Sequence, residues 1–266
     1  MMSKSRSQVL LVTVRWHWIS GFLGGALSFW RTLGIVEIGF FFNQALPATV
    51  GGDGARIFYA WKSGMPAERA FHSVICDRLA GMAGLILAGL VGMPFLPGPQ
   101  GRVSAMMLFA VVAGAVVAVI VFVLRRYWIA WLPTAMGAQL RRFIDLGRQF
   151  AVRPTAWFWM LIPSISIQLL STLFIYAALD QFGIKANFLD CAVLVAAVSL
   201  VIAIPISVAG WGVREGALVV ALATIGVPAG DAVASSLLAG VAQLIVALPG
   251  GLLLLVFKSK DRGPEG

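Results

Sequence analysis

The sequence predicts an all-α polytopic membrane protein with two inverted repeats, each containing a broken or re-entrant helix hairpin. Of its 266 residues, 60% are hydrophobic and 12% are charged, and the mean hydropathy is +0.92. Such a composition is typical of proteins that cross a membrane several times. We expect residues 1–266 to form a single integral membrane domain, because no long polar segment remains to build a soluble one.

A twelve-residue stretch occurs twice and predicts the repeats. Residues 45–56 read ALPATVGGDGAR, and residues 203–214 read AIPISVAGWGVR. Each copy ends an apolar run with Pro, breaks it with Gly, and places an Arg just beyond. In a membrane, a broken helix that carries a charge must be buried in protein or must line a watery cavity. The positions shared by the two copies are Ala45/Ala203, Pro47/Pro205, Val50/Val208, Gly52/Gly210, Gly54/Gly212 and Arg56/Arg214.

The first repeat is expected to begin with a broken segment at residues 33–50. Before it, residues 9–14 form an apolar segment too short to span the membrane. After it, Asp53 is predicted to cap a short helix over residues 54–62. A membrane crossing needs about 20 apolar residues, and both the broken segment and the short helix have fewer. We therefore expect a re-entrant hairpin.

Longer helices are expected in the rest of the chain. A helix that begins near Pro66 carries Asp77 and Arg78 into the membrane, where both must face protein or water. Residues 125–153 are rich in Arg and predict a basic amphipathic connection on the cytoplasmic surface. The apolar runs that predict membrane spans are 79–97, 103–124, 155–179, 188–209 and 232–257.

The positive charges of the loops predict the orientation of the two repeats. Repeat one covers about residues 33–97, and repeat two covers about residues 188–257. The positive-inside rule places the basic connection and the C-terminus in the cytoplasm. Counting crossings from these points places the turn at Pro66 inside and the turn at Pro228 outside. The repeats are therefore expected to enter from opposite faces, as inverted repeats do in many transporters.

The two breaks predict a site for an anion. In each copy a helix would start inside the membrane and direct unpaired N–H groups and the positive end of its dipole toward the break. An Arg adds a full charge there, and a phosphate-bearing lipid headgroup is the expected ligand. The predicted headgroup-binding residues are Arg56, Arg214, Gly51, Gly52, Gly210 and Gly212. The predicted pathway or coupling residues are Asn43, Asp53, Asp77, Arg78, Glu215 and Gln243.

Two of these carboxylates allow more than one interpretation. Asp53 and Glu215 could pair with the arginines, or could carry a proton or cation that is exchanged during transport. They could equally serve only as helix caps and dipole partners. Both interpretations remain open at this point.

Composition gives little support to metal, cofactor or nucleic-acid binding. The net charge is +9, but the basic residues lie beside predicted spans, which favours contact with anionic lipid over nucleic acid. The cysteines lie in apolar surroundings, and the chain has two histidines. We therefore expect no disulfide, no metal site and no cofactor. The residues concerned are Cys76, Cys191, His17 and His72.

The motifs resemble a known family. Their order is similar to that of the flippase-like family of bacterial and archaeal membrane proteins, the family of the lysylphosphatidylglycerol synthase transmembrane region. The resemblance covers nearly all of the chain. The stretches that carry it are 43–47, 51–56, 65–66 and 77–79 in the first half, and 205–207, 210–216, 242–243 and 248–251 in the second.

This resemblance implies translocation or presentation of a polar lipid across the cytoplasmic membrane. In the aminoacylating members, the transmembrane region precedes a cytosolic aminoacyltransferase domain. This chain ends shortly after its last predicted span, so we expect no lipid aminoacylation by it alone. Members also begin with two spans before an Arg-Trp element like Arg15-Trp16, so the N-terminus is expected to be truncated.

Two alternatives to a translocator arise from the same residues. One is a membrane enzyme acting on a lipid or a lipid-linked glycan, with Asp53, Asp77 or Glu215 as acid or base. Against it, no nucleophile is paired with a base, but whether the chain is an enzyme stays open. The other is an accessory subunit that presents lipid to a separate glycosyltransferase or lipid synthase.

Overall fold

The computed structural model describes residues 2–25, 27–45, 50–92, 114, 153–203 and 211–260. Within this part the chain forms eight helices and no strand, as the predicted fold class requires. The helices are α1 (Met2–Phe22), α2 (Phe29–Ala45), α3 (Val50–Lys62), α4 (Ala67–Gly92), α8 (Pro154–Gln181), α9 (Phe188–Ile202), α10 (Val213–Ala223) and α11 (Ala229–Lys260).

Three of these helices are long and apolar enough to cross a membrane. They contain the segments Ala67–Gly92, Thr155–Gln181 and Ala229–Leu254. A helix of 26 residues is about 39 Å long at about 1.5 Å per residue, which exceeds the about 30 Å of hydrocarbon in a bilayer. The class of helical membrane protein is therefore confirmed. α9 is also apolar but shorter.

The N-terminal segment differs from the sequence expectation. Residues 9–14 belong to α1, a helix of 21 residues, and do not form an isolated apolar piece. Polar side chains occur along this helix, and several are buried against its neighbours, including Thr13 and Arg15. The helix was missed because its hydrophobic pattern is interrupted where it packs against polar groups of other helices.

The first break also lies elsewhere than predicted. α2 ends at Ala45 and α3 begins at Val50, so Gly51 and Gly52 lie inside the helix. Asp53 is in the first turn of α3 and is not its cap. The side chain of Asn43 instead accepts a hydrogen bond from the Gly52 N–H at 3.0 Å. Residues 46–49, with Pro47, lie outside the described residues.

The second break is described only at its C-terminal side. α10 begins directly after Gly212, whose φ of +82° is a conformation that favours glycine. The Glu215 carboxylate accepts a hydrogen bond from the Gly212 N–H and caps the helix. Gly210 and the end of the predicted span 188–209 lie outside the described residues. So do the predicted connection 125–153, apart from Arg153, and the predicted span 103–124, apart from Gly114.

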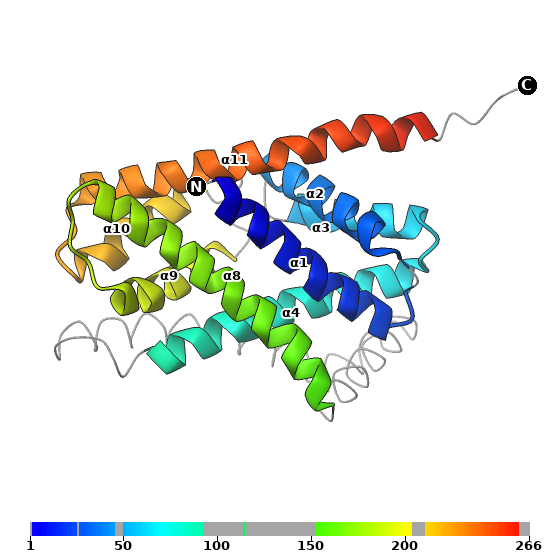
Figure 1. The fold of residues 1–266 in the computed structure, drawn as a ribbon, viewed down its shortest axis with the longest axis horizontal. Helices are drawn as coiled ribbons and strands as arrows, with labels where there is room; N and C mark the ends of the chain where they lie inside the picture. Colours follow the sequence, from blue (N-terminus) through cyan, green and yellow to red (C-terminus); the bar gives the residue numbers. More distant parts are fainter. Residues whose placement is uncertain are drawn as a thin grey trace, which may run out of the picture.

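Two of the hydrophobic cores each join several helices, and α4 packs on α1, α3, α8 and α9. In Figure 1 the long α11 and α4 lie along opposite sides of the view, and α1 and α8 run diagonally between them. One hydrophobic core joins α8, α9, α10 and the start of α11. A second joins α1, α2, α3 and the start of α4, with one residue of α11. The inverted relation of the two repeats stays a prediction.

Candidate functional site

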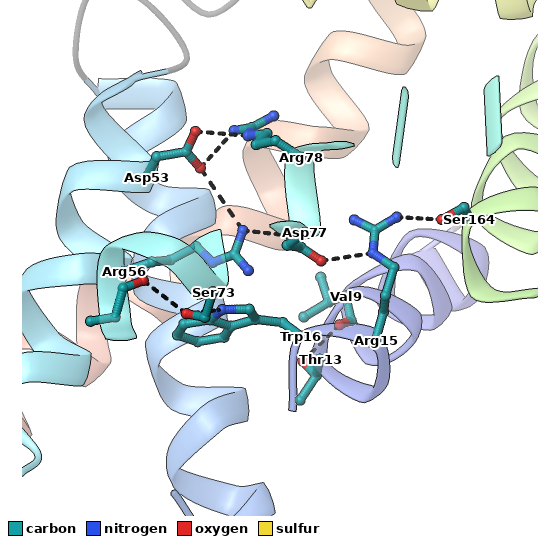
Figure 2. A network of polar contacts seen from close by, with 11 residues as sticks. Val9, Thr13, Arg15, Trp16, Asp53, Arg56, Ser73, Asp77, Arg78 and Ser164 are labelled. Atoms are coloured by element: carbon teal, nitrogen blue, oxygen red, sulfur yellow. Dashed lines mark hydrogen bonds and ion pairs between the residues drawn. The ribbon is translucent and has the colours of Figure 1, made fainter. Parts of the chain in front are cut away.

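A buried carboxylate on α4 holds arginines from two other helices. Asp77 is 1% exposed, and one of its oxygens lies 2.7 Å from Nε of Arg15 on α1. Its other oxygen lies 2.9 Å from Nη1 of Arg56 on α3. Nη1 of Arg15 also donates to the Ser164 hydroxyl on α8, at 2.8 Å (Figure 2). Asp77 therefore joins α1, α3 and α4, and Arg15 extends the network to α8.

A second carboxylate of the same cluster pairs with the next residue of α4. Both oxygens of Asp53 accept hydrogen bonds from Arg78, at 2.7 and 2.8 Å. Asp53 lies 3.9 Å from Arg56, a longer contact (Figure 2). A two-point arginine–carboxylate pair fixes the orientation of both groups. Asp53 is thus engaged mainly by Arg78.

Arg56 is the member of the cluster whose donors are least used. Arg56 is 6% exposed, and its guanidinium carbon lies 4.3 Å from the centre of the Trp16 ring. Its Nε and Nη2 are buried and have no hydrogen-bond partner among the described residues. Three guanidinium groups face two carboxylates here, so the cluster carries one positive charge in excess. Unsatisfied buried donors and an excess charge both favour binding of an anion.

These groups line a cavity of about 480 Å³. The cavity lies among α1, α2, α3, α4, α8 and α9, and its lining combines the charged cluster with hydroxyl and amide side chains. Cavities of about 300–1,000 Å³ hold small-molecule ligands in proteins. The polar residues that line it are Arg15, Asn43, Asp53, Arg56, Asp77, Arg78, Ser164, Gln168, Ser171 and Ser199.

The second predicted arginine lines a different and smaller cavity. Arg214 is 6% exposed and pairs with Glu215 at 2.8 Å, while its Nε donates to the Ser236 hydroxyl at 3.0 Å. The adjoining cavity is about 90 Å³ and includes Gln243. The two cavities share Ser171, Ser199 and Ile202 in their walls.

Comparison with known proteins assigns the family. A family model described as lysylphosphatidylglycerol synthase TM region matches residues 7–251. The chain belongs to this family. A search of curated proteins found no match, and neither did a search of solved structures. The match includes every residue of the charged cluster, and membership in a family of this description points to a function related to membrane lipids.

The predicted site residues of this protein fall into two sets, according to the cavity that they line. Asn43, Asp53, Arg56, Asp77 and Arg78 line the larger cavity. Arg214 and Gln243 line the smaller one. Arg56 and Arg214, expected to bind one headgroup together, line different cavities, and headgroup binding stays a prediction.

The glycines predicted to bind a headgroup have other contacts. A methyl group at Gly52 would overlap the Asn43 side chain and the Gly39 carbonyl, so this glycine permits the close approach of α2 and α3. The N–H groups of Gly52 and Gly212 are used by Asn43 and Glu215. These two amides are therefore not free to bind an anion.

Glu215, the predicted coupling carboxylate of the second half, makes contacts that fit both interpretations. Glu215 caps α10 and pairs with Arg214. It also accepts a hydrogen bond from Ser236 at 3.0 Å. Its acceptor capacity is thus largely used within the protein.

Sequence reasoning missed two important members of the cluster. Arg15 binds Asp77, and Ser164 in turn binds Arg15; both residues come from helices far from α4 in the chain. The Arg15-Trp16 pair inside an apolar segment was a usable signal, because a buried charge in a membrane helix usually has a partner. Ser164 gave no signal, since a single Ser in an apolar span is common.

Other chemistry has little basis in the described residues. No group of three or more His, Cys, Asp and Glu side chains in this part of the chain is placed to hold a metal ion. Cys76 and Cys191 are free and buried.

Proposed function

We propose that this chain translocates or presents an anionic phospholipid or lipid-linked intermediate, and that Arg56 binds its phosphate. The observation that carries this proposal is the state of Arg56 itself. The guanidinium is buried beside the larger cavity, with Nε and Nη2 lacking hydrogen-bond partners among the described residues. A phosphate oxygen supplies acceptors for such donors and neutralises the excess charge.

The arrangement of Asp77 and Asp53 supports this choice. Arg78 bonds both oxygens of Asp53, and Arg15 bonds one oxygen of Asp77. Arg56 is consequently held in place by one short ion pair, to Asp77, and keeps donors for a ligand. A preorganised guanidinium loses little freedom when an anion binds.

The size of the cavity suits the polar part of a lipid. A volume of about 480 Å³ is in the range that accommodates a small polar molecule, so a phosphate headgroup would lie inside while the acyl chains extend into the membrane. We place the protein in the cytoplasmic membrane, with its C-terminus in the cytoplasm, on the basis of the loop charges.

Exchange of headgroup-labelled lipids in proteoliposomes tests the proposal. We expect Arg56→Gln to lower the exchange rate of anionic phospholipids by roughly tenfold or more, because charge-assisted hydrogen bonds are lost. Arg56→Lys keeps the charge opposite Asp77 with fewer donors, and should give an intermediate rate. The matched control is Arg69→Gln, since Arg69 is exposed and donates to the Gly24 carbonyl at 2.9 Å.

The same measurement separates translocation from presentation. If the Arg56→Gln variant melts like the wild type and still exchanges lipid at the full rate, Arg56 has no part in the function. Phosphate binding at Arg56 without any exchange would instead support presentation of lipid to a separate glycosyltransferase or lipid synthase. That result would make identification of the partner enzyme the next step.

A further inference from the structure

A groove of about 450 Å³ lies between α2 and α11, away from the charged cluster. Trp30 and Glu37 line it from α2, and Pro249 and Leu252 line it from α11. None of its lining residues belongs to either cavity described above. The groove is therefore a separate feature, and a ligand bound in it is independent of the proposed function.

The groove lies next to a close contact between α2 and α11. A methyl group at Gly250 would overlap the backbone carbonyl of Glu37, and one at Gly251 would press on the Phe41 ring. The two helix backbones thus approach closely at the glycines. On the adjoining face of α11, Pro249 and Leu252 line the open groove.

Glu37 places an unsatisfied acceptor in this apolar setting. Its Oε2 is buried and has no hydrogen-bond partner among the described residues. The exposed Arg6 of α1 attracts the carboxylate but makes no hydrogen bond to it in this arrangement. Pro249 has no N–H and so cannot bond the Ile245 carbonyl one turn earlier. A ligand that fits here must be a hydrogen-bond donor, and a cation fits best.

The rest of the groove indicates that the ligand is a lipid. Trp30 is 77% exposed and Leu252 is 67% exposed, which gives the rim an apolar surface. Pro249 lies twenty residues, or about 30 Å, from the start of α11, so the groove is near one end of this span. Tryptophan at that level is typical of the membrane interface, where headgroups lie.

We propose that this groove binds an amine-bearing phospholipid, whose primary ammonium donates a hydrogen bond to the Glu37 carboxylate. The ammonium carries both the positive charge and the N–H groups that the buried oxygen lacks. A quaternary amine has the charge but no N–H donor, and a glycerol headgroup has donors but no positive charge. The site is therefore expected to distinguish three common headgroups by chemistry alone.

Native mass spectrometry of the purified full chain tests this proposal. The protein is mixed with equal amounts of phosphatidylethanolamine, phosphatidylcholine and phosphatidylglycerol that have identical acyl chains. In the Arg56→Gln background, where the larger cavity lacks its proposed phosphate ligand, we expect one phosphatidylethanolamine to bind with roughly tenfold preference over the other two. Adding Glu37→Gln should abolish that preference. Leu252→Trp, which fills the groove from an exposed position, should lower binding of this lipid without changing the melting temperature.

A matched control uses the other end of the same helix. Asp231→Asn removes a carboxylate from the first turn of α11, outside the groove, and should leave the preference unchanged. The proposal is overturned if the Arg56→Gln protein shows no preference for the primary amine, or if the preference remains after Glu37→Gln is added. A preference for phosphatidylglycerol that Arg56→Gln removes would instead report the larger cavity, which keeps the two sites distinguishable.

Discussion

The guanidinium of Arg56 lies over the ring of Trp16, with 4.3 Å between the guanidinium carbon and the ring centroid. The contact joins α3 to α1, and the Trp16 N–H donates to the Ser73 hydroxyl of α4 at 3.1 Å. A cation over an aromatic face is stabilised without use of its N–H groups. Trp16 therefore helps to hold Arg56 in place while leaving its donors available.

Removal of the Asp77 charge should destabilise the protein strongly. Asp77→Asn leaves Arg15 and Arg56 buried without their common counter-charge, and we expect a loss of about 3–5 kcal/mol in the free energy of unfolding. Thermal unfolding in detergent measures it. Asp231→Asn, in the first turn of α11, is the control and should change little. An unchanged melting temperature for Asp77→Asn would contradict the network.

Added phosphate should partly rescue the same variant. An anion in the cavity replaces the missing charge, so the melting temperature of Asp77→Asn should rise more with phosphate than that of wild type. Chloride at equal ionic strength is the control for screening. Equal shifts in the two proteins would indicate that phosphate does not enter the cavity.

The pair of Asp53 and Arg78 should contribute less than the Asp77 pairs. The Arg78 side chain is 38% exposed, so solvent screens this interaction. A double-mutant cycle with Asp53→Asn and Arg78→Gln should give a coupling energy of about 1 kcal/mol that decreases with salt. A coupling as large as that of a fully buried pair would show that the cavity excludes water.

Alanine substitutions at Gly52 and Gly54, two glycines of α3, should change the stability of the protein in opposite directions. Gly52→Ala introduces a methyl group that overlaps Asn43 and the Gly39 carbonyl, and should cost about 1–3 kcal/mol. Gly54→Ala meets no atom within 4 Å and should stabilise the helix by about 0.5–1 kcal/mol. Chemical or thermal unfolding of both variants checks the sign. Equal effects would mean that α2 and α3 are not closely packed here.

The inverted orientation of the repeats can be tested by labelling. Ala67→Cys and Ala229→Cys place single thiols at the exposed first residues of α4 and α11, in a chain whose buried Cys76 and Cys191 are replaced by Ala. A membrane-impermeant reagent should reach position 67 from the cytoplasm and position 229 from outside. Labelling of both from one side would exclude the inverted repeat.

The sequence predicted the class of fold because several long apolar runs in one chain are typical of membrane-spanning helices. The helices over residues 155–179 and 232–257 were predicted nearly at their observed bounds. α1 was missed because its pattern combines apolar residues with Arg15 and other polar groups that are satisfied only by distant helices.

The charged cluster contains residues that the sequence singled out, in an arrangement that the sequence did not predict. Arg56 and Asp77 were singled out because a charged side chain inside a membrane is costly unless it has a partner or a function. Sequence similarity between the two motifs suggested one shared site, yet the partners differ: Arg56 contacts Asp77 of another helix, while Arg214 is paired with its neighbour Glu215. Only three-dimensional packing decides which carboxylate an arginine reaches.

The wall shared by the two cavities has a consequence for how a headgroup could move. The hydroxyls of Ser171 and Ser199 donate to carbonyls of their own helices, those of Ile167 and Val195. The Ser171 oxygen also accepts a hydrogen bond from the Gln8 side chain at 2.9 Å, so neither hydroxyl has a free proton to offer at the shared wall. A phosphate bound at Arg56 would therefore find no hydroxyl donor on the wall that its cavity shares with the cavity of Arg214.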